Sequence, residues 1–217
     1  MIKAVLFDFD GTIADTLGVC VDAFKLTVEP NLGRTLELDE IRAKYFGPTE
    51  DGIFATHFPD RKDELLAIYL EHYARLQAQA PPLVDGVMPI IAALKRKGVH
   101  VALITAKGAQ SCKISLEFYG IENEFEHIEV GGSQGRVKDR AILQTLERMG
   151  VDRNDAVYVG DSPKDVISAH KACVPCWSAA WLHTADPAQI LAKGPERIFY
   201  SIDEFRQALE TELGSLE

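Results

Sequence analysis

The chain has 217 residues, enough for one well-packed domain with a smaller insertion. Hydrophobic residues make up 47% and charged residues 26%, which is typical of a globular protein and excludes a disordered one. The net charge of -10 disfavours a nucleic-acid partner, because phosphate backbones are bound by clustered Lys and Arg.

No targeting or membrane segment is evident. Residues 1–7 are apolar, but they run into Asp8 without the small-residue cleavage site of a signal peptide. No stretch approaches the ~18 apolar residues of a membrane-spanning helix. We therefore expect a cytoplasmic protein, monomeric or homodimeric, without a membrane partner.

Short apolar runs recur along the chain and are typical of buried strands. The runs cover residues 2–8, 99–105 and 156–160, with weaker ones at 125–130 and 174–180. Helical patterns that end at glycines lie between them, at residues 89–97, 109–119 and 138–149. This alternation predicts a parallel sheet covered by helices, with ligands at the carboxyl ends of the strands.

Residues 16–82 interrupt the alternation. They show helical periodicity without a convincing buried strand, at residues 17–28, 37–45 and 61–78. We predict an α/β fold with a Rossmann-like parallel-sheet core, formed by residues 1–15 and 83–217, and an inserted helical cap, formed by residues 16–82.

Asp8 and Asp10 stand two residues apart at the end of the first predicted strand. Both side chains are expected on one side of the strand, with Phe9 on the other, and Gly11 permits a sharp exit. Two carboxylates there are costly unless a cation or a proton compensates them. The alternative is that both simply face solvent in a loop.

Asp161 and Asp165 form a second acidic pair, after the strand at 156–160. If the two strands are neighbours, four carboxylates converge, and their repulsion favours binding of a divalent cation. Oxygen ligands favour magnesium over zinc. Helix capping explains Ser162, Pro163 and Asp165 equally well, but it leaves Asp161 unexplained.

Two further positions are weaker candidates. Thr105 offers a hydroxyl at a strand end, and the turn that starts at Ala106 can present backbone N–H groups to a phosphate. A plain helix cap explains Thr105 equally well. Lys138 opens a predicted helix and can reach the same edge, although a lysine there is more often solvated surface.

The pair Cys173 and Cys176 forms a C-x-x-C motif, flanked by His170 and His183. These residue types are those of a zinc site, but a lone pair of cysteines in an apolar stretch is more often packed in the core. We expect the four cysteines of the chain to be reduced thiols.

These segments together resemble the four signature motifs of the haloacid dehalogenase superfamily of phosphatases. The motifs are D-x-D-G-T at residues 8–12, the hydroxyl of Thr105, Lys138, and G-D-x-x-x-D at residues 160–165. The resemblance covers the predicted core, whereas the insertion resembles the helical cap of the superfamily only in position and length.

The resemblance implies covalent catalysis. Asp8 would attack phosphorus and form an aspartyl-phosphate, which divides one difficult displacement into two steps. Asp10 would act first as the acid and then as the base. Mg²⁺ would bind the Asp8 carboxylate, the Asp10 backbone carbonyl and Asp161, with Asp165 in support.

The resemblance also assigns phosphate binding to Thr105, Ala106 and Lys138. One departure is visible, because many members have Lys-Pro-x-Pro where this chain has Lys-Asp-Arg-Ala from residue 138. Lys107 or Arg136 can therefore share the role of Lys138.

The implied activity is hydrolysis of a small phosphorylated metabolite, as in phosphoglycolate phosphatase-like enzymes, with pyrophosphate, nucleotides and sugar phosphates still open. A phosphosugar mutase similar to β-phosphoglucomutase uses the same two aspartates and is an alternative. A non-catalytic regulator that binds a phosphorylated metabolite is another. Asp10 disfavours dehalogenation, because a halide leaving group needs no general acid.

Overall fold

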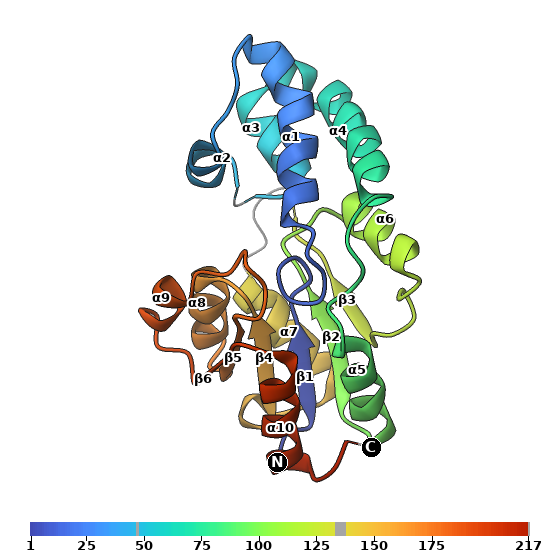
Figure 1. Cartoon of the computed structure of the whole chain (residues 1–217), viewed down its shortest axis with the longest axis vertical. Helices are drawn as coiled ribbons and strands as arrows, with labels where there is room; N and C mark the ends of the chain where they lie inside the picture. The colour runs from blue at the N-terminus through green and yellow to red at the C-terminus, as the bar shows by residue number, and fades with distance from the viewer. Residues whose placement is uncertain (47, 133–137, 217) are drawn as a thin grey trace.

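The computed structural model describes residues 1–46, 48–132 and 138–216. Within these ranges the chain forms one parallel sheet in the order β3-β2-β1-β4-β5-β6, with helices on both faces (Figure 1). The strands are β1 Ala4–Phe7, β2 His100–Ile104, β3 His127–Glu129, β4 Ala156–Gly160, β5 Cys176–Ala179 and β6 Arg197–Phe199. The predicted parallel sheet and its five expected strands are confirmed, and β6 is an addition.

The helices follow in chain order. They are α1 Leu17–Leu32, α2 Leu38–Lys44, α3 Glu50–His57, α4 Lys62–Gln77, α5 Val87–Arg96, α6 Ala109–Tyr119, α7 Lys138–Met149, α8 Pro163–Lys171, α9 Pro187–Leu191 and α10 Ile202–Leu213, with short 3₁₀ turns at Pro59–Arg61 and Arg153–Asp155. The glycines that close α6 and α7, Gly120 and Gly150, have φ angles of 65° and 66°, as helix ends of this kind require.

The four central strands, β2, β1, β4 and β5, are buried on both faces of the sheet, which explains their continuous apolar runs. In β1, Val5 and Phe7 join a cluster with residues of α5 and α10, whereas Ala4 and Leu6 join a cluster with residues of α7 and α8. The two clusters fix the sheet between two helical layers. As a result, the loops that follow β1 and β4 emerge together at the carboxyl edge.

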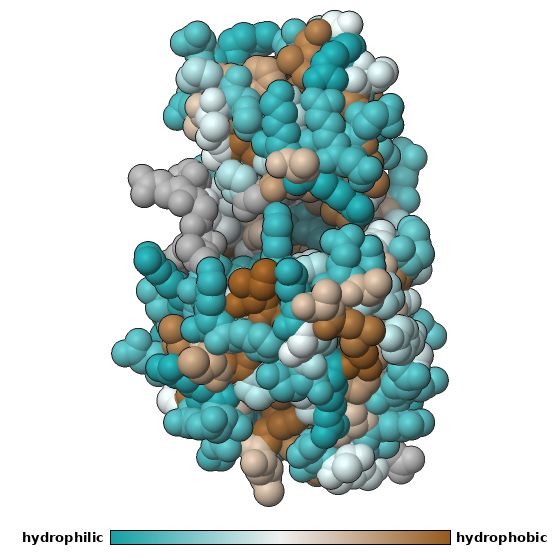
Figure 2. All heavy atoms as spheres, turned by 90° about the vertical axis from the view of Figure 1, so that its left-hand side faces the viewer, coloured by the Kyte–Doolittle hydropathy of each residue, from teal (hydrophilic) through white to brown (hydrophobic). Residues whose placement is uncertain are grey.

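The helices α1 to α4 enclose a third apolar cluster above that edge (Figure 1). Its buried members include Phe24, Phe54 and Tyr73, and the ring centroids of Phe24 and Phe54 lie 6.2 Å apart. The face of the molecule seen in Figure 2 is mainly hydrophilic, with apolar residues in separate groups. No helix within the described ranges combines the length and apolar character that crossing a bilayer requires.

Candidate active site

The site begins where β1 and β4 end side by side. The two strands pair in parallel with Phe7 opposite Val159, and the Asp8 N–H donates to the Val159 carbonyl at 2.8 Å. Asp161 directly follows β4. Because both chains leave the sheet at one level, Asp8 and Asp161 lie at the same edge.

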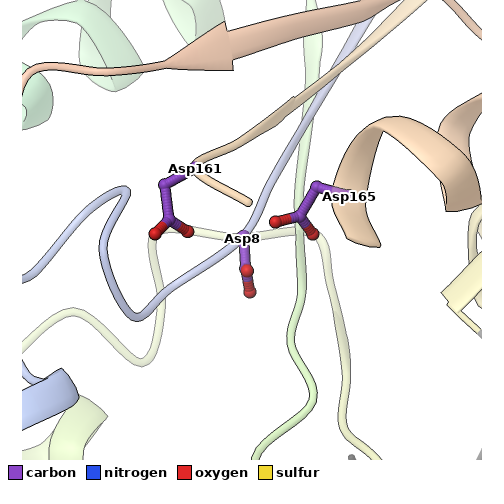
Figure 3. A group of neighbouring side chains, drawn as sticks. All are labelled: Asp8, Asp161 and Asp165. Carbon is purple, nitrogen blue, oxygen red and sulfur yellow. The ribbon is translucent and has the colours of Figure 1, made fainter. Parts of the chain in front are cut away.

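Three carboxylates meet at this edge. One oxygen from each of Asp8, Asp161 and Asp165 lies within 4.8 Å of the others (Figure 3). Asp8 is 7% exposed and Asp165 only 1%, while Asp161 is half-buried. Three negative charges so close together and so poorly solvated require compensation by a cation or by protons.

Lys138 supplies one compensating charge. Its Nζ lies 2.6 Å from Asp8 Oδ2 and 2.6 Å from Asp165 Oδ1. Although burial acts to lower the pKa of Lys138, the carboxylates of Asp165 and Asp8 raise it above its usual value, so the side chain stays charged. Among the residues that the structure describes, one ammonium faces three carboxylates, which leaves an excess of negative charge.

The pKa values of the three carboxyl groups shift in different directions. Burial, reinforced by Asp165 and Asp10, raises the pKa of Asp8 to about 7 against the opposing effect of Lys138. Burial and the charges of Asp165 and Asp8 also raise the pKa of Asp161 well above its usual range. The pKa of Asp165 is lowered despite its burial, because Lys138 and Ser162 stabilise its ionised form.

Local structure fixes Asp165 in place. Ser162 caps α8, and its N–H and hydroxyl both donate to Asp165 Oδ2, at 3.0 and 2.5 Å. The Tyr158 hydroxyl, from β4, donates to Asp165 Oδ1 at 3.1 Å. The capping interpretation of Ser162 and Asp165 is therefore correct, and the same cap holds a carboxylate of the acidic cluster.

Gly11 allows the two acidic loops to approach each other. Its φ is 82°, and a Cβ atom at this position would lie 2.1 Å from Asp161 Oδ2. The Thr12 hydroxyl donates weakly to Asp161 Oδ1, at 3.5 Å. The sharp exit expected at Gly11 is thus present, and its lack of a side chain makes room for Asp161.

The side chain of Asp10 leaves the cluster, contrary to the expectation that four carboxylates converge. Its Oδ1 accepts from Thr16 Oγ1 at 2.5 Å and from Lys107 Nζ at 3.1 Å. The simple alternation of strand side chains fails here because β1 ends at Phe7 and the chain is already turning at Asp10. Whether the Asp10 carbonyl binds a metal stays a prediction.

Thr105 and Ala106 follow β2 at the same edge. β2 pairs with β1, with Leu103 opposite Phe7. The Thr105 side chain is buried and its Oγ1 accepts from the Lys107 N–H at 3.2 Å, whereas Ala106 is exposed. Their roles in phosphate binding stay predictions.

Lys107 and Arg136 are the two cations that the sequence offered beside Lys138. Lys107 pairs with Asp10, whereas it is Lys138 that contacts Asp8. Arg136 lies outside the described residues. In the C-x-x-C motif, Cys173 is exposed and Cys176 is buried in β5, so the two thiols occupy different environments.

Sequence reasoning did not assign the contacts of Lys107, Thr16 and Tyr158. From the sequence, Tyr158 is an ordinary residue of a buried strand, and Lys107 is a residue that can share the role of Lys138. The only available signal was the polarity of Thr16 and Lys107 at the ends of predicted elements. Lys107 and Asp10 are 97 residues apart, so only the folded chain reveals their pairing.

The residues present fit a magnesium ion. The cluster offers only carboxylate oxygens, which hard divalent cations prefer. Burial, reinforced by the neighbouring carboxylates, raises the pKa of Asp8 and of Asp161, so their ionised forms are costly without a cation. The Lys138 ammonium contacts Asp8 and Asp165, whereas Asp161 receives a weak hydrogen bond from the Thr12 hydroxyl.

Comparison with known proteins settles the family. The family model for haloacid dehalogenase-like hydrolases matches residues 5–179. The chain belongs to this family. The resemblance read from the four motifs, and with it the prediction of a hydrolase, is confirmed.

Individual relatives cover nearly the whole chain. A phosphoglycolate phosphatase from Rhodospirillum rubrum is 30% identical over 207 residues, covering 88% of this chain and 85% of its own. A Caldanaerobacter subterraneus protein with the provisional name pyrophosphatase PpaX is 29% identical over 212 residues, covering 96% and 94%. The structure of CbbY from Rhodobacter sphaeroides in complex with phosphate has a TM-score of 0.77 at 23% identity, covering 94% and 96%, and supports the fold.

Proposed function

We propose that this protein is a magnesium-dependent phosphatase that hydrolyses small phosphorylated metabolites through an aspartyl-phosphate on Asp8. Membership of a hydrolase family, relatives named as phosphatases, and the acidic cluster around Asp8 support this activity. The observation that carries the proposal is the position of Asp8, whose carboxylate lies at a strand end within reach of Lys138 and two further carboxylates.

In the first step, one Asp8 oxygen attacks phosphorus as the bond between phosphorus and the ester oxygen breaks. Asp10 enters this step in its protonated form and gives the proton to the departing oxygen, and the phosphoryl group stays on Asp8. In the second step, a water oxygen attacks phosphorus and gives a proton to Asp10. Phosphate leaves, Asp8 is free again, and Asp10 is ready for the next cycle.

The other residues hold the reacting groups. The Lys138 ammonium lies 2.6 Å from Asp8 Oδ2, where it can offset charge on the transferring phosphoryl oxygens. The Thr105 hydroxyl and the turn at Ala106 follow β2, which pairs with β1, and in this proposal they donate hydrogen bonds to those oxygens. The backbone N–H of Phe9 donates to Asp8 Oδ1 at 2.8 Å and so orients the nucleophile.

Magnesium would be held by Asp8 and Asp161, with the Asp10 carbonyl, and with Asp165 in support. When bound, it would neutralise the excess negative charge that otherwise repels a phosphate from this edge.

We further propose that residues 1–15 and 83–217 form the catalytic core and residues 16–82 a cap that selects the substrate. The separate apolar cluster of α1 to α4 supports this division. A cavity of about 480 Å³ lies between them, lined by residues of α1 and α2, the segment after α4, and the loop at His183 and Thr184.

A phosphate-release assay tests the proposal. Phosphoglycolate and pyrophosphate, suggested by the names of the relatives, would be compared with sugar phosphates and nucleotides, in magnesium and in chelator. Release that requires magnesium supports the proposal, and release that is undiminished in chelator rejects the metal. A phosphosugar mutase would instead convert one sugar phosphate into its isomer without net release of phosphate.

A further inference from the structure

A second lysine of the site is almost fully buried. Lys107, in the turn between β2 and α6, is 5% exposed, and its Nζ lies 3.1 Å from Asp10 Oδ1. The Asp10 carboxylate is the opposite charge that compensates the burial of this ammonium. A buried ammonium of this kind persists only when its donors are satisfied.

The remaining donors of Lys107 are directed at the helices above the sheet. Its Nζ lies 2.6 Å from the Tyr73 hydroxyl oxygen on α4 and 3.5 Å from Cys20 Sγ on α1. With Asp10 these contacts account for all three N–H groups of the ammonium. Lys107 therefore has a single preferred position, defined by three different elements.

Tyr73 is itself fixed. It is fully buried, and its hydroxyl oxygen lies 2.8 Å from Ser115 Oγ on α6 and 3.0 Å from Gln77 Oε1 on α4. The Lys107 Nζ also lies 4.5 Å from the centroid of the Tyr73 ring, which adds a cation–π attraction. A continuous polar network thus connects α4 and α6 to Asp10.

All the contacts that the described residues make with the Asp10 side chain converge on one oxygen. Oδ1 accepts from Lys107 and from Thr16, and the Cys20 thiol lies 3.8 Å from the same atom. Holding one oxygen from several sides fixes the rotation of the carboxyl group. It also leaves Oδ2 as the oxygen available for proton transfer.

We infer that Lys107 is a positioning residue for the acid–base step, which fixes Asp10 through Oδ1 and is itself fixed by Tyr73 of α4. The inference rests on the proposed phosphatase activity. A general acid acts only at hydrogen-bond distance from the leaving oxygen, so a mobile Asp10 would protonate it poorly. The position of the α4 helix would then control the acid through one buried lysine.

The test compares two phosphate esters that differ in their need for an acid. The leaving group of an alkyl phosphate is an alkoxide, which is a poor leaving group and requires protonation. The leaving group of p-nitrophenyl phosphate is p-nitrophenolate, which hardly requires it. The variants are Lys107→Met, which keeps the aliphatic stem and removes the ammonium, and Tyr73→Phe, which removes only the hydroxyl. Lys113→Met is the matched control, because Lys113 is an exposed lysine on the adjacent helix α6.

We expect Lys107→Met to lower kcat/KM about 10²-fold for the alkyl phosphate and less than about 10-fold for p-nitrophenyl phosphate. Tyr73→Phe should shift the ratio of the two kcat/KM values, alkyl phosphate to p-nitrophenyl phosphate, in the same direction by a smaller factor. Lys113→Met should leave this ratio unchanged. In an Asp10→Asn background, Lys107→Met should cause little further loss, because both changes remove the same function.

Equal losses for the two esters, or full additivity with Asp10→Asn, would mean that Lys107 serves only packing and would overturn the inference. If Lys107→Met does not fold, as judged by circular dichroism, the ratio measured in Tyr73→Phe decides. A wild-type protein that releases phosphate in magnesium from neither ester and from no substrate of the phosphate-release assay would overturn the proposed function and this inference with it. That result is distinct from an active enzyme whose ratio is unchanged in the variants.

Discussion

Asp8 and Asp10 are two residues apart, yet their side chains belong to different regions of the molecule. Asp8 joins an acidic cluster whose members follow β1 and β4, and its lysine is Lys138. Asp10 contacts Cys20 of α1, and its lysine is Lys107, which in turn contacts Tyr73 of α4. One region is built from the ends of the strands, whereas the other is completed by helices of the inserted segment.

This difference separates two chemical tasks. The Asp8 region gathers excess negative charge and suits a metal ion and a nucleophile. The Asp10 region pairs one carboxylate with one ammonium and suits a group whose orientation must be controlled. A motif of five residues can serve both tasks because β1 ends at Phe7 and the chain is already turning at Asp10.

Removal of the nucleophile should have the largest effect. Asp8→Asn keeps the shape of the side chain but replaces the attacking oxygen, and we expect phosphate release to fall at least about 10³-fold. Thermal unfolding in chelator should show a folded protein, because burial of a neutral amide is less costly than burial of a charge. Activity close to that of the wild type would contradict the assignment of the nucleophile to the Asp8 region.

Lys138→Met should have the next largest effect. It leaves the carboxylates of Asp8 and Asp165 without the ammonium that lies 2.6 Å from each. We expect a loss of about 10²–10³-fold in kcat, because charge on the transferring phosphoryl group is no longer offset. Steady-state kinetics on the preferred substrate measures this loss, and an unchanged kcat would contradict the role of Lys138.

Gly11→Ala should disturb specifically the acidic cluster of the Asp8 region, where we propose that magnesium binds. The new Cβ would lie 2.1 Å from Asp161 Oδ2, at a φ of 82° that non-glycine residues rarely adopt. We expect a loss of about 1–3 kcal/mol in the free energy of unfolding and weaker magnesium activation. In the control variant Gly18→Ala, the Cβ meets no atom within 4 Å, so urea denaturation should show no loss of stability.

The pH dependence of stability should separate the two regions further. The pKa of Asp8 rises to about 7 in the folded protein from its ordinary 3.8, so folding binds a proton more tightly and Asp8 stabilises the fold most at low pH. In chelator, this contribution should disappear as the pH rises from about 4 to about 7.

Magnesium favours the ionised carboxyl groups and should therefore raise the melting temperature more at about pH 8 than at about pH 5.5. Differential scanning fluorimetry measures both effects, with Asp8→Asn as the control because an amide does not titrate. A pH slope in chelator that is the same in this variant and in the wild type would show that Asp8 is not its source.

The smallest effect should come from Glu50, on α3. Its carboxylate accepts from the Gly108 N–H at 2.7 Å and from the Ser111 hydroxyl, at the N-terminus of α6. Glu50→Ala should cost about 0.5–2 kcal/mol, as the loss of a helix cap does, and Glu50→Gln should cost less because one acceptor remains. Equal stability of all three proteins would show that this contact is not needed.

The sequence predicted the parallel sheet and the acidic loops because both depend on local patterns. Continuous apolar runs mark strands that are buried on both faces, and Gly11 and Ser162 mark the turn and the cap that follow. The strand β6 escaped prediction because it has only three residues and begins with an exposed Arg197. The helix α3 escaped because Gly52 interrupts a weak apolar pattern.

The pairing of Asp10 with Lys107 could not be predicted for a different reason. It depends on the approach of α1 and α4 to the turn after β2, and no local pattern specifies that approach. The carboxyl ends of neighbouring parallel strands meet at one edge in every such sheet, so Asp8 and Asp161 could be placed together without knowledge of the helices. The position of an inserted segment relative to the sheet has no comparable rule.

The most direct test of the account is detection of the phosphoryl group on Asp8. The enzyme would be mixed with its preferred substrate and magnesium, quenched in acid within the first turnover, and digested for mass spectrometry. We predict that the peptide containing Asp8 carries one added phosphoryl group, absent in Asp8→Asn and without substrate. An active enzyme whose Asp8 peptide is never modified, or whose phosphoryl group appears on another residue, would contradict the account.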